Sequence, residues 1–139
     1  MLRVVFDTNV LVSALIKHGK PRELWSNVLE GKIKLYTSDE LLDKFSEVVI
    51  RPEFKRYIRK SRIQRFRRIL LQKATLTKVK THFPQATKDP DDNIVLKAAY
   101  NAKADYIISG DKEVLALKEF KGIRIVTVGN MLDALINQD

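Results

Sequence analysis

Short apolar runs alternate along this chain with longer stretches whose apolar residues recur every three or four positions. The short runs are typical of buried strands, and the longer stretches have the spacing of amphipathic helices. The pattern predicts buried strands at residues 4–6, 33–36, 105–109 and 123–127, and an edge strand at 75–80. It predicts helices at residues 10–17, 24–29, 41–49, 94–102, 113–118 and 131–136, and basic helices between 51 and 73 that are separated near Ser61.

Strands that alternate with helices over this length form a parallel sheet with helices on both faces, so we expect an α/β fold. The chain has no internal repeat, low-complexity tract or linker, and its 139 residues are enough to bury one core. We therefore predict a single domain over residues 1–139. Its longest loop-like stretch is 82–90, which contains two prolines.

The first predicted strand stops abruptly at Asp7, which is followed by Thr8 and Asn9. Ligands bind at the carboxyl ends of the strands in open parallel sheets, so Asp7 lies where chemistry is expected. The alternative is that Asp7, Thr8 or Asn9 only caps the helix that follows. The residues fit both interpretations.

The amino-acid composition narrows the possible chemistry. The chain has no Cys, which excludes disulfides, thiolate metal sites and Cys nucleophiles, and it has only two His. A bound metal must therefore be held by oxygen ligands or by one of these His. The chain has no apolar run long enough to span a bilayer and no amino-terminal targeting signal, so we expect a soluble, cytoplasmic protein without a membrane partner.

Positive charge is concentrated in one segment. The chain has 26 Lys and Arg against 17 Asp and Glu, a formal net charge of +9. Residues 51–73, which we name the basic segment, contain ten basic residues and one acid and so carry the whole net charge. Such a segment favours binding to a polyanion such as nucleic acid, and a solvated helix face is the alternative. The candidate contacts are Arg59, Lys60, Arg62, Arg65 and Arg68.

Aspartates follow two predicted strands and open a predicted helix. Asp7 and Asp111 each come after a strand, and Asp91 and Asp92 lie just before the apolar positions of the helix at 94–102. Carboxylates brought to one rim repel each other unless a cation lies among them or some are protonated. Oxygen ligands favour Mg²⁺ or Mn²⁺, which suit phosphoryl chemistry. The alternative for Asp91 and Asp92 is a favourable interaction with the helix dipole.

Several motifs occur in an order that resembles a PIN domain. They are Phe6-Asp7-Thr8-Asn9-Val10, Ser38-x-Glu40-Leu41-Leu42, Arg51-Pro52-x-Phe54, Asp89-Pro90-Asp91-Asp92-Asn93 and Ser109-Gly110-Asp111-Lys112. More narrowly, the chain is similar to the branch described as toxin components of toxin–antitoxin pairs, the VapC-like ribonucleases. The resemblance covers residues 2–127. It implies a three-layer sandwich with a five-stranded parallel sheet flanked by helices, and the activity of a metal-dependent endoribonuclease.

The resemblance also implies roles for individual residues. It places Asp7, Asp92 and Asp111 at acidic positions that hold one or two Mg²⁺ or Mn²⁺ ions, with Asp91 as the adjacent acid. Asn9 and Ser109 match the polar residues that accompany them. The implied partners are RNA, an antitoxin protein and a second copy of the chain in a homodimer. No glycine-rich fingerprint follows any strand, so we expect no organic cofactor.

The chain departs from the family at one acidic position. Lys44 stands where a glutamate is expected on the third helix. Three alternatives follow: Glu40 reaches the site from the same face, Asp43 substitutes, or the cluster is one carboxylate short. We prefer Glu40, because Asp43 points about 100° away from Lys44 around a helix. Glu40 also fits a capping box with Thr37, which would give it a structural role instead.

Two other functional classes remain open. A haloacid-dehalogenase-like phosphatase also begins with a strand that ends in aspartate and threonine, but it needs a second aspartate where this chain has Asn9. The stronger alternative is a non-catalytic module that binds RNA or a partner protein and has a degenerate nuclease site because of Lys44.

Overall fold

The computed structural model describes residues 1–81 and 89–137. In this part of the chain, six strands form one sheet with the order β3-β2-β1-β4-β6-β5. The strands are β1 (Arg3–Phe6), β2 (Lys34–Thr37), β3 (Thr75–Leu76), β4 (Tyr106–Ile108), β5 (Glu119–Phe120) and β6 (Ile123–Val126). Neighbouring strands pair in parallel, except that β5 is antiparallel to β6.

The five strands expected from the sequence are confirmed, but the sheet is mixed and has a sixth strand. The unexpected strand is β5, which forms a tight hairpin with β6 through Lys121 and Gly122. A two-residue hairpin turn of type I′ requires positive φ at both turn residues, and φ is 52° at Lys121 and 82° at Gly122. A strand of two residues is too short to give an alternating pattern, so the sequence did not predict it.

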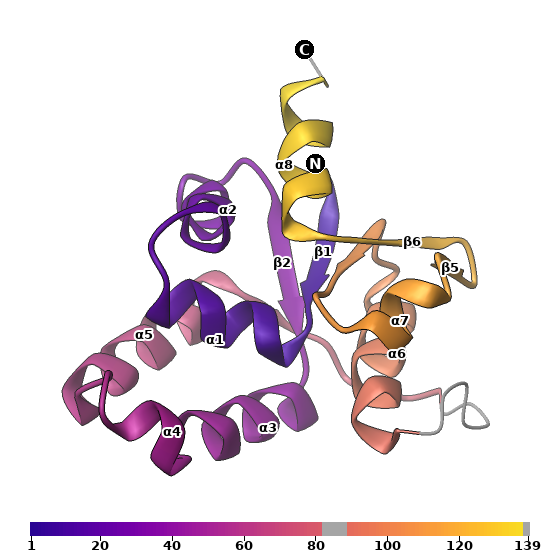
Figure 1. Cartoon of the computed structure of the whole chain (residues 1–139). Helices are drawn as coiled ribbons and strands as arrows, with labels where there is room; N and C mark the ends of the chain where they lie inside the picture. The colour runs from indigo at the N-terminus through magenta and orange to yellow at the C-terminus, as the bar shows by residue number, and fades with distance from the viewer. Residues whose placement is uncertain (82–88, 138–139) are drawn as a thin grey trace.

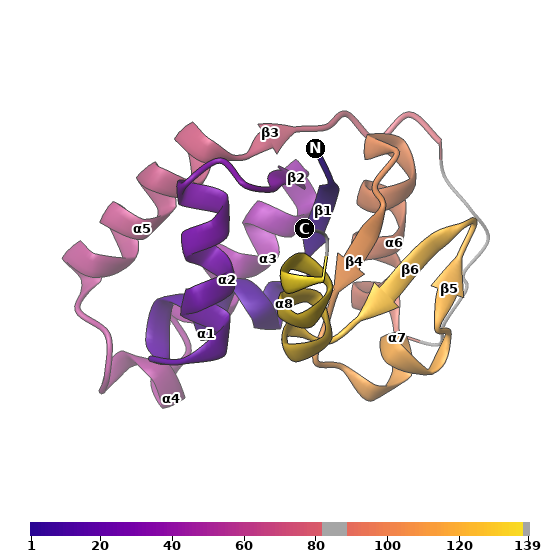
Figure 2. The same cartoon turned by 90° about the horizontal axis from the view of Figure 1, so that it is seen from above.

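Helices cover both faces of the sheet in a three-layer arrangement (Figures 1 and 2). One face packs against α1 (Thr8–Ile16), α2 (Lys20–Leu29), α3 (Asp39–Val49), α5 (Lys60–Lys73) and α8 (Val128–Ile136). The other face packs against α6 (Pro90–Ala102) and α7 (Lys112–Ala116). Along β1, Val4 and Phe6 enter the first hydrophobic cluster and Val5 enters the second. This alternation explains why β1 is apolar at every position after Arg3, because both faces of the strand are buried there.

Local capping corrects two expectations about helix ends. Ser38 is the N-cap of α3, and its hydroxyl accepts a hydrogen bond from the backbone N–H of Leu41 at 3.2 Å. The proposed capping box between Thr37 and Glu40 is therefore wrong, because Thr37 is the buried last residue of β2. The basic segment forms α4 (Pro52–Lys55) and α5, and the break between them falls at residues 56–59 rather than at Ser61.

The remaining expectations are met in part. β3 is shorter than the edge strand expected at 75–80. Most of the loop expected at 82–90 lies outside the described residues, and Asp89 already belongs to the start of α6 as its N-cap. None of the helices among residues 1–81 and 89–137 combines the length and apolar character needed to cross a bilayer.

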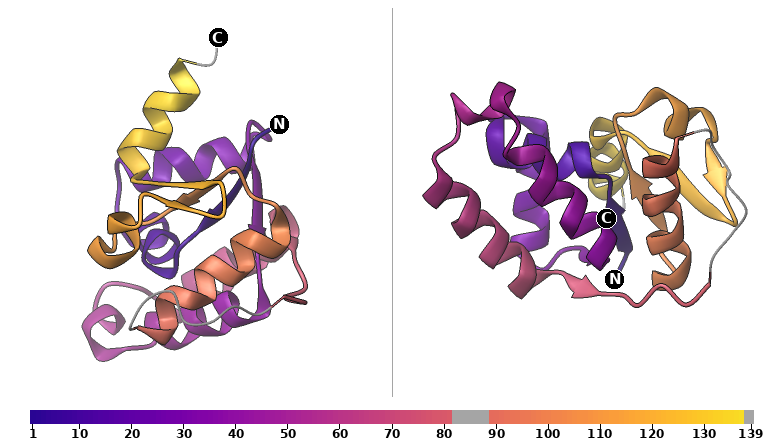
Figure 3. Two further views of the ribbon diagram at one scale, coloured as in Figure 1. Left: turned by 90° about the vertical axis from the view of Figure 1, so that its right-hand side faces the viewer. Right: turned by 90° about the horizontal axis from the view of Figure 1, so that it is seen from below.

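The topology places a crevice at one end of the sheet. β1 has β2 on one side and β4 on the other, and the chain visits these two neighbours in separate halves. This is a topological switch point, where open α/β sheets bind ligands beyond the carboxyl ends of the strands. α3 and α6 contact each other at this end, one from each half of the chain (Figure 3).

Candidate active site

An acidic cavity of about 150 Å³ lies at the carboxyl ends of β1 and β4. Thr8, Asn9, Lys44, Val48 and Arg51 line it together with five aspartates, Asp7, Asp89, Asp91, Asp92 and Asp111. The structure thus brings Asp7, Asp92 and Asp111 together with the accompanying residues Asn9 and Asp91. These residues come from the end of β1, the start of α1, α3, the start of α6 and the segment after β4.

Asp7 both caps a helix and lines the acidic cavity. It is the N-cap of α1, and its Oδ1 accepts a hydrogen bond from the backbone N–H of Thr8 at 2.8 Å. Its Oδ2 accepts a hydrogen bond from the Ser109 hydroxyl at 2.7 Å. The two interpretations of Asp7 in the sequence are therefore compatible, because one carboxylate does both.

Ser109 connects the first and last of these acids. Its side chain is fully buried, and its Oγ accepts a hydrogen bond from the backbone N–H of Asp111 at 3.0 Å while donating to Asp7. Asp111 in turn caps α7, with Oδ1 accepting from the backbone N–H of Glu113 at 2.8 Å. A single hydroxyl thus fixes the relative positions of the segments that follow β1 and β4.

Among the acids of the cavity, Asp92 has the least favourable surroundings for its charged form. Its side chain is only 4% exposed, and its Oδ2 has no hydrogen-bond partner among the described residues. Burial, followed by the negative charges of Asp111, Asp89, Asp7 and Glu113, raises the pKa of Asp92 to about 7. A cation close to this carboxylate would favour its ionised form at neutral pH.

The pKa of Asp7 is also raised, mainly by burial and further by the charges of Asp111 and Asp91. The hydrogen bonds from Ser109 and Thr8 oppose this shift, because they favour the ionised form. The acids of the cavity therefore destabilise one another's charged forms. Such an arrangement binds protons or a positive ion.

Asp89 is a residue of the cavity that the sequence analysis did not single out as a site residue. It is the N-cap of α6, and its Oδ1 accepts a hydrogen bond from the backbone N–H of Asp91 at 2.9 Å. Its position directly before Pro90 was the available signal, since proline favours the first turn of a helix and the preceding residue then caps it. Arg51 was likewise assigned to the basic segment and to a family motif without a role in the site, yet it lines the cavity.

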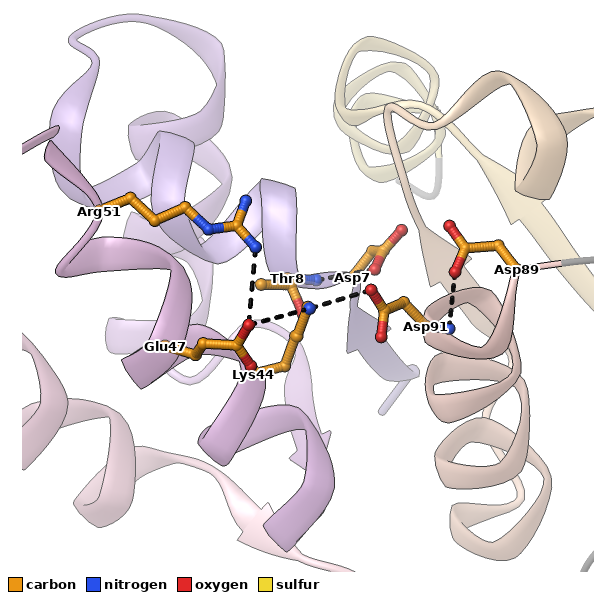
Figure 4. A network of polar contacts seen from close by, with 7 residues as sticks. All are labelled: Asp7, Thr8, Lys44, Glu47, Arg51, Asp89 and Asp91. Atoms are coloured by element: carbon orange, nitrogen blue, oxygen red, sulfur yellow. Dashed lines mark hydrogen bonds and ion pairs between the residues drawn. The ribbon is translucent and has the colours of Figure 1, made fainter. Parts of the chain in front are cut away.

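Lys44 points into the acidic cavity from α3. Its Nζ lies 2.9 Å from Oδ2 of Asp91 and 3.5 Å from Oε1 of Glu47, and Nη2 of Arg51 lies 3.7 Å from the same Glu47 oxygen (Figure 4). The hydrogen bond to Asp91 is the main cause that raises the pKa of Lys44. The lysine therefore keeps its positive charge inside an acidic site.

Glu40 and Asp43 are not among the residues that line the cavity. Oε1 of Glu40 lies 3.7 Å from Nζ of Lys97 on α6, and Asp43 is exposed. The sequence analysis preferred Glu40 as the substitute for the missing glutamate, but the structure does not bring Glu40 into the cavity. Although Glu40 shares a helix face with Lys44, it lies one turn nearer the N-terminus of α3 and pairs with a different residue of α6.

Because Glu40 and Asp43 do not line the cavity, of the described residues only its aspartates could hold a divalent ion. The described residues contain no group of three or more carboxylate or imidazole side chains already close enough to hold a metal ion. The donor set nevertheless suits Mg²⁺ or Mn²⁺, because it consists of carboxylate oxygens and includes Oδ2 of Asp92, which has no hydrogen-bond partner in residues 1–81 and 89–137. Asp7, Asp92 and Asp111 are the residues that would hold an ion, and they must approach one another to do so.

The basic segment begins at this cavity and continues along α5. Arg59, Lys60, Arg62, Arg65 and Arg68 are all exposed. Arg62 and Arg65 border a second cleft of about 480 Å³ between α1, α2 and α5, whose walls include Trp25 and Phe66. The aromatic residues of the segment differ, since Phe66 is buried and Tyr57 is exposed.

Comparisons with known proteins agree with this architecture. The chain matches the family described as PIN domain over residues 3–113. It is 32% identical over 120 residues to the uncharacterized protein MJ1680 of Methanocaldococcus jannaschii, which covers 85% of this chain and 76% of that protein.

Two solved structures share the fold at low sequence identity. PAE2754 from Pyrobaculum aerophilum has a TM-score of 0.64 and 13% identity, over 99% of this chain and 91% of that one. VapBC2 from Rickettsia felis, bound to a DNA fragment from their promoter, has a TM-score of 0.62 and 14% identity, over 91% of this chain and 98% of that one. With the family match over most of its length, the chain belongs to the PIN-domain family.

Proposed function

We propose that this protein is a Mg²⁺- or Mn²⁺-dependent endoribonuclease that hydrolyses phosphodiester bonds of RNA, with Asp7, Asp92 and Asp111 as the residues that hold the ion. PIN domains are generally nucleases and typically use divalent metals. The observation that carries the proposal is the buried Oδ2 of Asp92, which has no hydrogen-bond partner among the described residues and lies in a cavity with four other aspartates. A bound ion would supply a water of lowered pKa and would neutralise charge on the phosphate.

The residues around the proposed ion have different roles. Ser109 donates a hydrogen bond to Asp7, which favours the ionised form of that carboxylate and fixes its orientation. Asp111 is held by the backbone amides at the start of α7, which leaves the rest of its carboxylate toward the cavity. Arg51 places a guanidinium at the cavity wall, where it can bind a phosphate of the substrate.

We place the RNA backbone along the basic segment, starting from Arg51. Cations on α5 would neutralise phosphates, a contact that gives affinity and position but no sequence information. The exposed Tyr57 offers a ring on which an unpaired base can stack.

We also propose that the protein acts as the toxin of a toxin–antitoxin pair in the cytoplasm and that it forms a homodimer. This part rests on the sequence resemblance to the toxin branch and on the likeness in fold to VapBC2. Light scattering on the purified chain tests the dimer, and co-purification with the product of a neighbouring gene tests the antitoxin.

The decisive experiment is cleavage of single-stranded RNA with and without Mn²⁺. Asp7→Asn removes a charge from the cavity, and we expect its activity to fall by about a hundredfold or more, because metal ligation supplies much of the catalysis. Asp105→Asn is the matched control, since Asp105 lies at the opposite end of β4 and accepts a hydrogen bond from the backbone N–H of Arg3 at 2.8 Å. Equal losses in the two variants, or cleavage that ignores Mn²⁺, would contradict the proposal.

One observation favours the alternative of a non-catalytic module. The Lys44 ammonium already occupies the side of the cavity next to Asp91, and the described acids form no preassembled group of three. On this alternative, the chain binds RNA in gel-shift experiments but gives no products in Mg²⁺ or Mn²⁺ at any protein concentration.

A further inference from the structure

Two lysines connect α3 to α6, and only one of them reaches the acidic cavity. Lys44 pairs with Asp91 at 2.9 Å and lines the cavity, with 19% of its side chain exposed. Lys97 pairs with Glu40 at 3.7 Å and is not among the lining residues. The first pair therefore differs from the second in its location and its closer contact.

Compared with a glutamate at the same position, Lys44 changes the charge of the cavity lining by two units, which is the charge of one divalent ion. The lining contains five aspartates and two cations, Lys44 and Arg51, which leaves three negative charges when all are ionised. A single divalent ion leaves one negative charge, and two ions would make the site positive. A glutamate at position 44 would leave five negative charges, which two divalent ions nearly balance.

The positive charge of Lys44 acts on one side of the cavity. Its pKa is raised mainly by the hydrogen bond to Asp91 and further by the charge of Glu47. Asp92 still has a buried oxygen without a partner among the described residues. The chain itself therefore supplies a positive charge beside Asp91, whereas the buried oxygen of Asp92 has no such partner among the described residues.

We propose that the Lys44 ammonium occupies one of two cation positions in this site, so that the protein binds a single divalent ion on the side of Asp7, Asp92 and Asp111. This inference rests on the metal site of the proposed function. The ammonium is a compact charge with three hydrogen-bond donors, so it can contact a phosphate oxygen while it neutralises Asp91. Unlike an ion, it is not removed by a chelator.

The test is the number of Mn²⁺ ions bound by the full chain, measured by native mass spectrometry and calorimetric titration. We expect one ion for the unmodified protein and two for Lys44→Glu. Lys97→Glu is the control, because it makes the same charge change on a lysine between the same two helices outside the cavity. It is expected to bind one ion.

A second variant keeps the proposal testable if Lys44→Glu does not fold. Asp91→Asn removes the closer of the two carboxylate partners of Lys44 and keeps Glu47, and Asp91 is half-exposed. We expect its Mn²⁺ affinity to stay within about threefold of the unmodified protein, whereas Asp92→Asn should weaken it by about tenfold or more. A large loss in Asp91→Asn would show that Asp91 itself holds the ion, which overturns the role given to Lys44.

The outcomes separate this inference from the proposed nuclease. Two ions in the unmodified protein, or an unchanged count in a folded Lys44→Glu variant, overturn the inference while metal-dependent RNA cleavage still stands. An ion bound only after Lys44→Glu would mean that the lysine blocks the site, and this also overturns it. The absence of bound ions from every variant overturns both.

Discussion

The N-termini of α5 and α6 carry opposite charge, although the same dipole acts on both. α6 starts with the capping residue Asp89, and Asp91 and Asp92 follow in its first turn. α5 starts at Arg59, which makes no side-chain capping hydrogen bond, and its first turn has no acid. Lys60 and Arg62 add positive charge there.

The difference shows which charges the helices themselves explain. Acids near a helix N-terminus are favourable by about 0.3–1 kcal/mol each, and bases there are unfavourable by a similar amount. The dipole therefore accounts for Asp89 and Asp91, which also make ordinary polar contacts. It does not account for Asp92, which is buried with a raised pKa, or for the cations of α5. The charged form of Asp92 and the cations at the start of α5 are therefore unfavourable for folding, as expected for groups that bind an ion of opposite charge.

The largest expected effect comes from reversing the charge of α5. The triple variant Arg62→Glu, Arg65→Glu and Arg68→Glu changes three exposed residues. We expect RNA affinity to fall roughly a hundredfold and the log–log salt slope to lose about two units, because each phosphate contact on a single strand contributes about 0.7. Fluorescence anisotropy over a range of salt concentrations measures both.

A charge-matched triple variant controls for the change in net charge. Lys17→Glu, Lys78→Glu and Arg124→Glu alter exposed residues outside the basic segment. We expect RNA affinity to change by less than about threefold at moderate salt, since screening weakens distant charges. If both triple variants lose affinity equally, RNA responds to net charge alone, and the assignment of α5 fails. Retained RNA binding with loss of an acidic protein partner would assign α5 to that partner.

The next effect concerns Asp92 and the pH dependence of folding without metal. The folded protein binds this proton more tightly than the unfolded chain, because the pKa of Asp92 is raised from 3.8 to about 7. Its destabilising effect is therefore absent below about pH 4, grows as the pH rises and is complete above about pH 7.

Asp92→Asn removes this effect. In a chelator at pH 8, we expect the free energy of unfolding to increase by about 1–3 kcal/mol and its decline between pH 4 and 7 to become shallower. Urea unfolding across this pH range measures the change, with Asp133→Asn on the exposed side of α8 as the control. A variant that is less stable at pH 8 would assign Asp92 a structural role.

The sequence predicted the parts of the fold and site that depend on local order. Apolar runs located the five parallel strands, and an acid directly after a buried strand must lie at the carboxyl edge of the sheet. The sequence therefore predicts that Asp7 and Asp111 lie in one crevice, and both residues line the acidic cavity.

The features of the site that the sequence did not predict depend on which long side chains contact each other between neighbouring helices. Lys44 and Glu40 share one face of α3, yet their partners on α6 differ because each reaches a different turn of that helix. The packing of α3 on α6 decides this pairing, and helical spacing does not encode it. Arg51 also lines the acidic cavity, and its ion pair with Glu47 lies beside the one that Lys44 makes with the same oxygen.

The smallest expected effect tests whether stability and RNA binding oppose each other at the start of α5. The Arg59 backbone is extended, with φ −71° and ψ 142°, which is the conformation that an N-cap residue requires. Arg59→Asp should therefore add a capping hydrogen bond and a favourable charge, and raise the free energy of unfolding by about 1 kcal/mol. RNA affinity should fall about three- to tenfold, because one phosphate contact is replaced by repulsion. Arg59→Met, which removes the charge without adding a cap, is expected to weaken RNA binding without the gain in stability. A variant Arg59→Asp that gains stability and keeps its RNA affinity would show that this end of α5 does not contact RNA.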